Sequence, residues 1–391
     1  MIKQEKSYMQ FYYNAVTKKE LREIVDYEQP TKYIVGSTRY DEIHGTPVLT
    51  AGQSFILGYT DETAGIYKAS KENPVIIFDD FTTSFHWVDF DFKVKSSALK
   101  ILTPKEKSSS SFRYIYYAMK SISYKPVDHA RQWISVFSKI KIDIPSLKVQ
   151  EDIAKYLDKF NLLITELNTE LMLRRKQYLY YRNKILDFTH ENAECLEINE
   201  IFDIRNGYTP SKAKAEYWTK GIIPWFRLDD IRQNGRILFD SLQHITPEAV
   251  KGKGLFPKNS IIVSTSATIG EHALIKVDFL CNQRFTCLTI KPEFTHKLNI
   301  IFLHHYMYLV DEWCKNNINI SGFAGVDMPK FKRVKIPIPS MLVQERVINV
   351  LDKFESLVND NNIGIPAEID ARRRQYDYYR RKLLKFEQLV N

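Results

Sequence analysis

The stretch IPSLKVQEDIAKYLDKF at residues 144–160 returns with few changes as IPSMLVQERVINVLDKF at residues 338–354. The match resumes further along the chain, where RRKQYLYYRNKILDF at residues 174–188 corresponds to RRRQYDYYRRKLLKF at residues 372–386. One chain therefore holds two copies of the same helical sequence, and this repeat decides how the rest of the fold is divided.

The second copy is four residues longer than the first, because the offset between the copies grows from 194 (338 − 144) to 198 (372 − 174). The extra residues fall in NNIGIPAEI, residues 361–369. Gly364 and Pro366 in this segment predict a break in a helix that the first copy continues.

Both copies carry the spacing of a coiled-coil seam, with residues at alternating steps of four and three. The seam residues are Ile153, Leu157, Phe160, Ile164, Leu167, Leu171, Tyr178, Tyr181 and Ile185 in the first copy, and Val347, Leu351, Phe354, Tyr376, Tyr379 and Leu383 in the second. A sustained period of about 3.5 residues favours helices that pair with each other over the alternative, ordinary amphipathic helices lying on their own domains. The first helix would span ~60 Å at ~1.5 Å per residue. A pseudo-twofold relation between the copies predicts an antiparallel pair.

The seam contains one charged residue in each copy, Arg174 in the first and Arg372 in the second. The two arginines occupy equivalent positions of the repeat. We expect each to pair with a carboxylate and to fix the register of the helices.

The repeats divide the chain into four segments, 1–143, 144–190, 191–337 and 338–391. The two long segments resemble each other faintly and in a consistent order. The similar stretches are 23–27 and 200–204, 45–49 and 221–225, and 74–80 and 260–266. We therefore predict two copies of one α+β domain, in which short apolar strands are separated by turn residues.

Neither long segment carries the motif of an enzyme. A phosphate-binding G-x-x-x-x-G-K-[ST] loop, a G-x-G-x-x-G turn, an H-E-x-x-H pair and a G-x-S-x-G elbow are all absent from the sequence. The adjacent His304 and His305 lie in an apolar helical pattern, so we expect them to serve packing. The four cysteines, Cys195, Cys281, Cys287 and Cys314, form no C-x-x-C pair, so no metal site is predicted.

The composition favours a folded chain with a polyanionic partner. The 391 residues are 44% hydrophobic and carry a net charge of +9, which suits nucleic acid without demanding it. The amino terminus is too polar for a signal peptide, and no run of 18 apolar residues could form a membrane helix. We therefore expect a cytoplasmic protein that does not engage a membrane.

Polar and basic residues gather in the loops predicted for both long segments. Arg and Lys suit guanine edges or phosphates, Asn and Gln suit adenine, and hydroxyl groups suit either. The candidate DNA-binding residues are Gln53, Thr82, Thr83, His86, Arg131 and Gln132 in the first segment, and Tyr208, Thr209, Lys212, Arg227, Arg232, Gln233, Ser266, Arg284 and Lys330 in the second. For each residue the alternative is a solvated loop position without a ligand.

Three stretches carry a resemblance to a known family: IPIPSMLVQERVINVLDKF from Ile336, GIPAEIDARRRQYDYYRRKLLKF from Gly364, and GIIPWFRLDDI from Gly221. Together they resemble the specificity (S) subunit of type I restriction-modification systems, and the resemblance spans the whole chain. TELNTEL at residues 165–171 is similar to the short helical repeat whose copy number in that family changes the DNA spacer.

The resemblance implies a non-catalytic DNA-recognition subunit with two target-recognition domains and two helical conserved regions that form an antiparallel coiled coil. Each recognition domain would bind one half of a bipartite double-stranded DNA target, and the helices would set the gap. The chain itself would hold no cofactor. Methyltransferase (modification) subunits would carry S-adenosylmethionine, and restriction/translocase subunits would use ATP and Mg²⁺. A coiled-coil scaffold or an RNA-binding protein remains the alternative.

Overall fold

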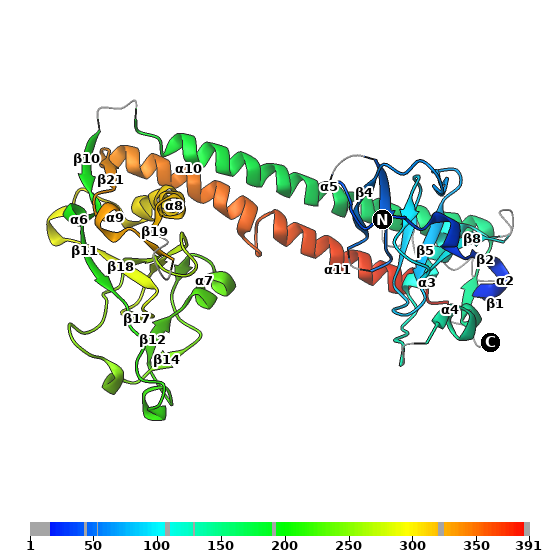
Figure 1. The fold of residues 1–391 in the computed structure, drawn as a ribbon, viewed down its shortest axis with the longest axis horizontal. Coiled ribbons are helices and arrows are strands. Elements are labelled where there is room, and N and C mark those ends of the chain that lie inside the picture. Colours follow the sequence, from blue (N-terminus) through cyan, green and yellow to red (C-terminus); the bar gives the residue numbers. More distant parts are fainter. Residues whose placement is uncertain are drawn as a thin grey trace, which may run out of the picture. The chain divides into compact units, whose positions relative to one another are not determined.

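The chain folds into two compact units, Met1–Asn168 with Glu368–Asn391, and Thr169–Ala367. The structure is a computed structural model that describes residues 16–42, 45–52, 54–105, 110–127, 130–189, 193–319 and 324–386 (Figure 1). Each unit combines one long segment with parts of the helical repeats. The division into the four segments 1–143, 144–190, 191–337 and 338–391 remains a prediction.

The first unit is α+β. Its elements are β1 (Thr17–Glu20), α2 (Leu21–Ile24), β2 (Val25–Glu28), η1 (Pro30–Tyr33), β3 (Thr46–Leu49), β4 (Ile56–Thr60), β5 (Val75–Asp79), β6 (Phe85–Val88), β7 (Lys93–Val94), β8 (Leu99–Pro104), α3 (Phe112–Lys120), α4 (Gln132–Ser135), η2 (Phe137–Lys139) and β9 (Lys141–Ile144). A central antiparallel sheet has the order β2-β8-β5-β6, beside a smaller sheet β4-β3-β7 and the pair β1-β9.

The second unit repeats this plan. Its elements are β10 (Glu194–Glu197), α6 (Ile198–Ile201), β11 (Phe202–Asn206), η3 (Ala215–Tyr217), β12 (Ile223–Phe226), α7 (Leu228–Asn234), β13 (Ile237–Leu238), β14 (His244–Ile245), η4 (Pro247–Ala249), β15 (Ser260–Ser264), β16 (His272–Ile275), β17 (Leu280–Cys281), β18 (Phe285–Ile290), η5 (Pro292–Phe294), α8 (Ile300–Asn316), β19 (Ile318–Asn319), β20 (Gly325–Val326), α9 (Met328–Phe331) and β21 (Lys335–Ile338). The sheets β11-β18-β15-β16-β13, β14-β12-β17 and β10-β21 match those of the first unit in order, except that β13 adds a parallel strand beside β16. The predicted α+β class and the duplicated domain are confirmed.

Both faces of each central sheet are covered. In β5, Ile76 and Phe78 pack against the cluster that contains α3, whereas Val75 and Ile77 pack against a second cluster on the opposite face. Residues of β15 alternate between two clusters in the same way. Successive side chains of a strand point to opposite faces, so strands covered on both sides are apolar throughout.

The helical repeats form α5 (Leu147–Ile185), α10 (Met341–Asn359) and α11 (Ile365–Leu383). The helix of the first copy is continuous, and the second copy is interrupted between Asn359 and Ile365, as predicted. A Cβ on Gly364 would lie 2.4 Å from the carbonyl oxygen of Ser356 and 2.8 Å from that of Asp360. Glycine is therefore required where the chain turns back over the end of α10.

Aromatic rings join the helices inside each unit in an antiparallel sense. In the first unit the ring of Tyr379 lies 5.7 Å from that of Phe160 on α5. Residues nearer the start of α5 share a cluster with residues nearer the end of α11. In the second unit the ring of Phe354 lies 6.4 Å from that of Tyr178, and the Arg175 guanidinium donates to the Val358 carbonyl oxygen over 3.4 Å.

Burial along the seam is uneven. Buried seam residues are Ile153, Leu157, Tyr178, Val347 and Leu351. Half-buried ones are Phe160, Ile164, Leu167, Leu171, Ile185, Phe354, Tyr376, Tyr379 and Leu383. Tyr181 departs from the expected pattern because it is 40% exposed, although its ring lies 6.1 Å from that of Phe354.

The two seam arginines form their ion pairs within their own helices. Arg174 pairs with Glu170, and Arg372 pairs with Glu368, in each case one turn earlier. Each arginine also donates to a glutamine three residues later, Gln177 or Gln375. The prediction that these pairs fix the register between helices is therefore wrong, because i,i+4 pairs stabilise a single helix.

One buried glutamine joins each domain to its helix. The Gln344 side chain is fully buried, accepts a hydrogen bond from the Asn299 backbone at the start of α8, and donates to the carbonyl oxygens of Lys297 and Pro339. In the first unit Gln150 accepts from the Ser111 backbone at the start of α3 and donates to Pro145. The two glutamines are equivalent positions of the sequence repeat.

We expect Gln344→Leu to lower the free energy of unfolding by roughly 1–3 kcal/mol, because it leaves the N–H of half-buried Asn299 without its acceptor. Denaturant unfolding of the full chain measures this loss. The same change at exposed Gln233 is the control and should leave stability nearly unchanged. Equal stability of the two variants would contradict the role assigned to Gln344.

Candidate nucleic-acid interface

In the second unit a close turn brings two predicted loops together. The backbone N–H of Gly207 donates to Phe285, and that of Tyr208 donates to Cys281. A Cβ on Gly207 would lie 2.3 Å from the Cys281 carbonyl oxygen, so only glycine permits this approach. The Thr209 hydroxyl then donates to the side-chain carbonyl oxygen of Gln283. The loop after β11 is thus fixed against the turn that carries Arg284.

The end of β12 joins the same group of loops. The Asn282 backbone donates to the Phe226 carbonyl oxygen over 3.1 Å, which places Arg227 beside the 282–284 turn. Buried Asp230 holds the start of α7 by accepting from the Arg227 backbone at 2.6 Å. The Arg227 guanidinium lies 3.5 Å from Asp229. Arg232 and Gln233 are exposed on α7.

The loop after β15 completes the surface. The Thr265 backbone donates to the Arg284 carbonyl oxygen, and the Val326 backbone donates to that of Thr265. Ser266 is bridged to Gly325 just before α9, which carries exposed Lys330. The structure therefore gathers four separate polar loops, 206–214, 226–236, 264–271 and 282–285, with Lys330 at their margin.

The candidates in the first unit surround the β5–β6 hairpin. Thr82 is exposed in its turn. His86 on β6 lies 3.0 Å from the Gly52 carbonyl oxygen and stacks on Phe55, and burial lowers the pKa of its imidazole. Exposed Arg131 sits next to this hairpin, because the backbone of the following residue donates to Asp80. Gln53 lies outside the described residues.

The polar groups of three predicted contact residues are already hydrogen-bonded within the fold. Gln132 is 2% exposed; its amide accepts from Tyr124 and donates to Ala130. Thr83 is 9% exposed, with its hydroxyl bonded to the preceding carbonyl. The Tyr208 hydroxyl donates to the Ala249 carbonyl and accepts from the Lys251 backbone. These side chains shape the loops and do not present free polar groups.

Other candidates differ in how far they are engaged. Arg232 pairs with Glu271 at 3.2 Å, and Lys330 pairs with Asp327 at 3.1 Å. Within the described residues, the guanidinium groups of Arg284 and Arg131 form no hydrogen bond or ion pair. Among the candidate residues, Arg131 in the first unit and Arg284 in the second are therefore exposed arginines whose guanidinium groups are available to a ligand.

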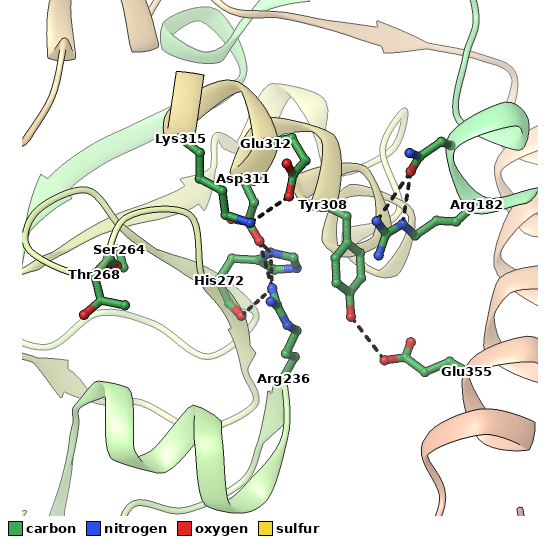
Figure 2. Close-up of polar contacts among 11 residues, drawn as sticks. Arg182, Arg236, Ser264, Thr268, His272, Tyr308, Asp311, Glu312, Lys315 and Glu355 are labelled. Atoms are coloured by element: carbon green, nitrogen blue, oxygen red, sulfur yellow. Dashed lines mark hydrogen bonds and ion pairs between the residues drawn. The ribbon is translucent and has the colours of Figure 1, made fainter. Parts of the chain in front are cut away.

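The sequence did not predict a buried polar cluster behind the second set of loops. His272 and Arg236 both contact the Oδ2 atom of Asp311, at 2.7 and 2.8 Å (Figure 2). Both partners lie far from Asp311 in the sequence, so no local spacing reveals the cluster. Gln150 and Gln344 could have been found, because the repeat retains a glutamine among apolar positions.

Burial governs the charge of this cluster. It lowers the pKa of His304 well below the usual range, and it lowers the pKa of His272 despite the neighbouring Asp311 carboxylate. Burial alone would raise the pKa of Asp311, but His272 and Arg236 lower it. His304 and His305 are 0% and 1% exposed, as expected for residues that pack in the core, and His305 in addition bonds to Asp352. No group of ligands that could hold a metal occurs among the described residues.

A family model described as the type I restriction modification DNA specificity domain matches the chain twice, at residues 11–173 and 190–371. The chain is 42% identical over 387 residues to the specificity subunit of the type I restriction enzyme EcoR124I/EcoR124II of Escherichia coli, covering 94% of this chain and 93% of that protein. It is 49% identical over 217 residues to the EcoprrI specificity subunit of the same organism, covering 54% of each.

Two solved structures share the fold. One is described under the structural basis of complex assembly and conformational transition of the type I R-M system. It has a TM-score of 0.63 at 15% identity, and the match covers 96% of this chain and 98% of that chain. The S subunit of a type I restriction-modification system from M. genitalium has a TM-score of 0.54 at 14% identity, and the match covers 95% of this chain and 96% of that chain.

Among the described helices, none is long and apolar enough to cross a membrane.

The buried histidines predict a loss of stability in acid. Because burial lowers the pKa of His272 and His304, the unfolded chain binds more protons than the folded chain below pH ~6.5. For each extra proton that the unfolded chain binds, the free energy of unfolding falls by roughly 1.4 kcal/mol per unit decrease in pH. The unfolding free energy should therefore fall from pH 6.5 to 5.5. His304→Phe should reduce this slope, whereas His296→Gln at an exposed position should not. Identical slopes in all three proteins would refute the assignment.

Proposed function

The chain belongs to the family of type I restriction-modification DNA specificity subunits, and from this premise we propose that its two domains bind the two halves of a bipartite double-stranded DNA target. The duplicated domain, with matching strand orders and with candidate residues in the turn after β5 and in the equivalent loop after β15, is the observation that carries the proposal. A non-catalytic DNA-recognition role follows from family membership. The scaffold and RNA-binding alternatives are not favoured.

The loops offer the chemistry of major-groove recognition. A guanidinium can donate two parallel hydrogen bonds to a guanine edge, and amide or hydroxyl groups can contact adenine or phosphate. Arg284 and Arg131 are exposed, and Gln233 and Thr82 are exposed on neighbouring elements of the same domains. The net charge of +9 supports attraction to the DNA backbone. The ion pair between Arg232 and Glu271 would have to break before Arg232 could contact a base.

Partner subunits would supply the chemistry. We propose methyltransferase subunits that carry S-adenosylmethionine, and restriction/translocase subunits that use ATP and Mg²⁺. The role of this chain is to bind the target and to place it for those subunits. Exposed apolar side chains on the long helices, such as Met172 and Leu173 on α5 and Leu342 on α10, support docking of other proteins there.

We propose that α5 acts as the spacer between the half-sites. Its 39 residues form one helix without interruption, at roughly 58 Å for ~1.5 Å per residue. TELNTEL at residues 165–171 lies within this helix, with Thr165, Glu166 and Asn168 exposed. Residues added there would lengthen the rod without entering a buried cluster.

Arginine substitutions test the assignment of half-sites. Arg284→Ala should weaken discrimination at one base position of one half-site by roughly 1–3 kcal/mol, because the bidentate contact is lost. Arg131→Ala should act on the other half-site, so each variant serves as the control for the other. Methylome sequencing of a host that expresses the chain with modification subunits measures both. A uniform loss over all sequences would instead assign the arginine to phosphate.

Helix insertions test the spacer. Duplicating residues 165–168 adds ~6 Å and about 400° of rotation, so the seam stays close to its original face. The gap between half-sites should grow by one or two base pairs at ~3.4 Å each. Duplicating residues 165–166 alone rotates the helix by about 200° and should prevent assembly. If the four-residue variant methylates sites of the original spacing, α5 does not set the gap.

A further inference from the structure

Two elements of the proposed DNA surface end on the same buried carboxylate. Helix α7 is followed by Gly235, with a φ of 86°, and then by Arg236. The loop 265–271 is followed by His272, the first residue of β16. The Asp311 Oδ2 atom on α8 lies 2.8 Å from the Nη1 atom of Arg236 and 2.7 Å from the Nδ1 atom of His272 (Figure 2).

The cluster holds one carboxylate, one guanidinium and one imidazole. Nδ1 of His272 lies 2.7 Å from the Asp311 carboxylate and 2.9 Å from the Nη1 atom of Arg236, and burial lowers the pKa of the imidazole. The side chains of His272 and Asp311 are 0% and 3% exposed. The Arg236 guanidinium therefore supplies the positive charge that balances the buried carboxylate. Removing one member of such a group leaves an uncompensated buried charge.

The cluster continues to the long helices. The Arg236 guanidinium lies 4.7 Å from the centroid of the Tyr308 ring, and that of Arg182 on α5 lies 4.1 Å from the same centroid. Figure 2 shows the ring between the two arginines. The Tyr308 hydroxyl donates to Glu355 on α10 over 3.2 Å. Every one of these residues belongs to the second unit.

In the first unit, other residues occupy the position that corresponds to His272. In the strand pairing, Phe78 faces Phe85 as Val263 faces His272. There the Lys120 ammonium donates to the Phe85 carbonyl oxygen and lies 4.5 Å from its ring centroid. The arrangement of one carboxylate with an arginine and a histidine thus belongs to the second domain.

We propose that Asp311 is a positioning residue for DNA recognition. It fixes the ends of α7 and of loop 265–271 relative to each other, and so sets where Arg232, Gln233 and Ser266 meet the second half-site. The Arg232–Glu271 pair, at 3.2 Å, links the same two elements nearer the surface. This inference rests on the proposed function, and it adds a residue that does not itself touch DNA.

The test selects bound sequences from a library of random duplexes with the purified full chain. The wild-type chain should enrich two half-site motifs, and failure to do so would contradict the proposed function. Asp311→Asn, which keeps the size of the side chain, should lose enrichment at positions of the second motif by roughly tenfold, the scale of one base contact. The first motif should be unchanged. Retention of both motifs, or loss of both together, would overturn the positioning role alone.

Two further variants separate positioning from stability. Ser260→Ala removes buried hydrogen bonds to Pro257 and Thr289 at the opposite end of β15, and it should lower stability while keeping the second motif. The double change Arg236→Gln with Asp311→Asn removes both charges, so stability should recover relative to Asp311→Asn while the second motif stays weak. Loss of the motif in Ser260→Ala at matched stability, or its return in the double variant, would overturn the proposal.

Discussion

Each recognition domain depends on one buried glutamine at the start of a repeated helix. Gln150 and Gln344 join three backbone segments: the end of a strand, the first turn of the long helix, and the start of α3 or α8. An amide can accept and donate at once, so one side chain satisfies groups that a buried helix start would otherwise leave unpaired. Gln150 thereby fixes the first domain to α5, which we propose as the spacer, and Gln344 fixes the second domain to α10. An apolar residue of equal size could not replace either glutamine.

The long-range architecture could be predicted because the sequence repeats internally and its helices keep a regular heptad spacing. Residues 144–160 and 338–354 indicate two copies, and the inserted glycine and proline predict the break between α10 and α11. Tyr181 shows the limit of that approach, because it occupies a seam position of the heptad and is nevertheless 40% exposed. Arg174 shows another limit, because a carboxylate one turn away on its own helix is a nearer partner than any across the seam.

The candidate interface was only partly predictable, for a physical reason. Loop composition identifies polar residues, but it does not distinguish a side chain that contacts solvent from one that supports the loop. Gln132 and Tyr208 both look like groove-contacting residues in the sequence. In the structure Gln132 bonds to the Tyr124 hydroxyl and to the Ala130 carbonyl oxygen, and the Tyr208 hydroxyl bonds to backbone atoms of Ala249 and Lys251. Arg284 and Arg131 look the same in sequence and are exposed. The distinction arises only from tertiary contacts, which for Tyr208 come from a loop about 40 residues later.

The two domains solve one packing problem with different chemistry. Tyr117 on α3 donates to Asp158 of α5, and His305 on α8 bonds to Asp352 of α10, so the anchor to each helix retains its aspartate while its partner changes. Behind the loops the difference is greater, with Phe85 and Lys120 in one domain and a carboxylate cluster around Asp311 in the other. Because both domains contact their helix through an equivalent aspartate, the residues packed behind the loops can differ while the domain keeps its place on the helix. This separation lets one scaffold hold two unlike recognition surfaces.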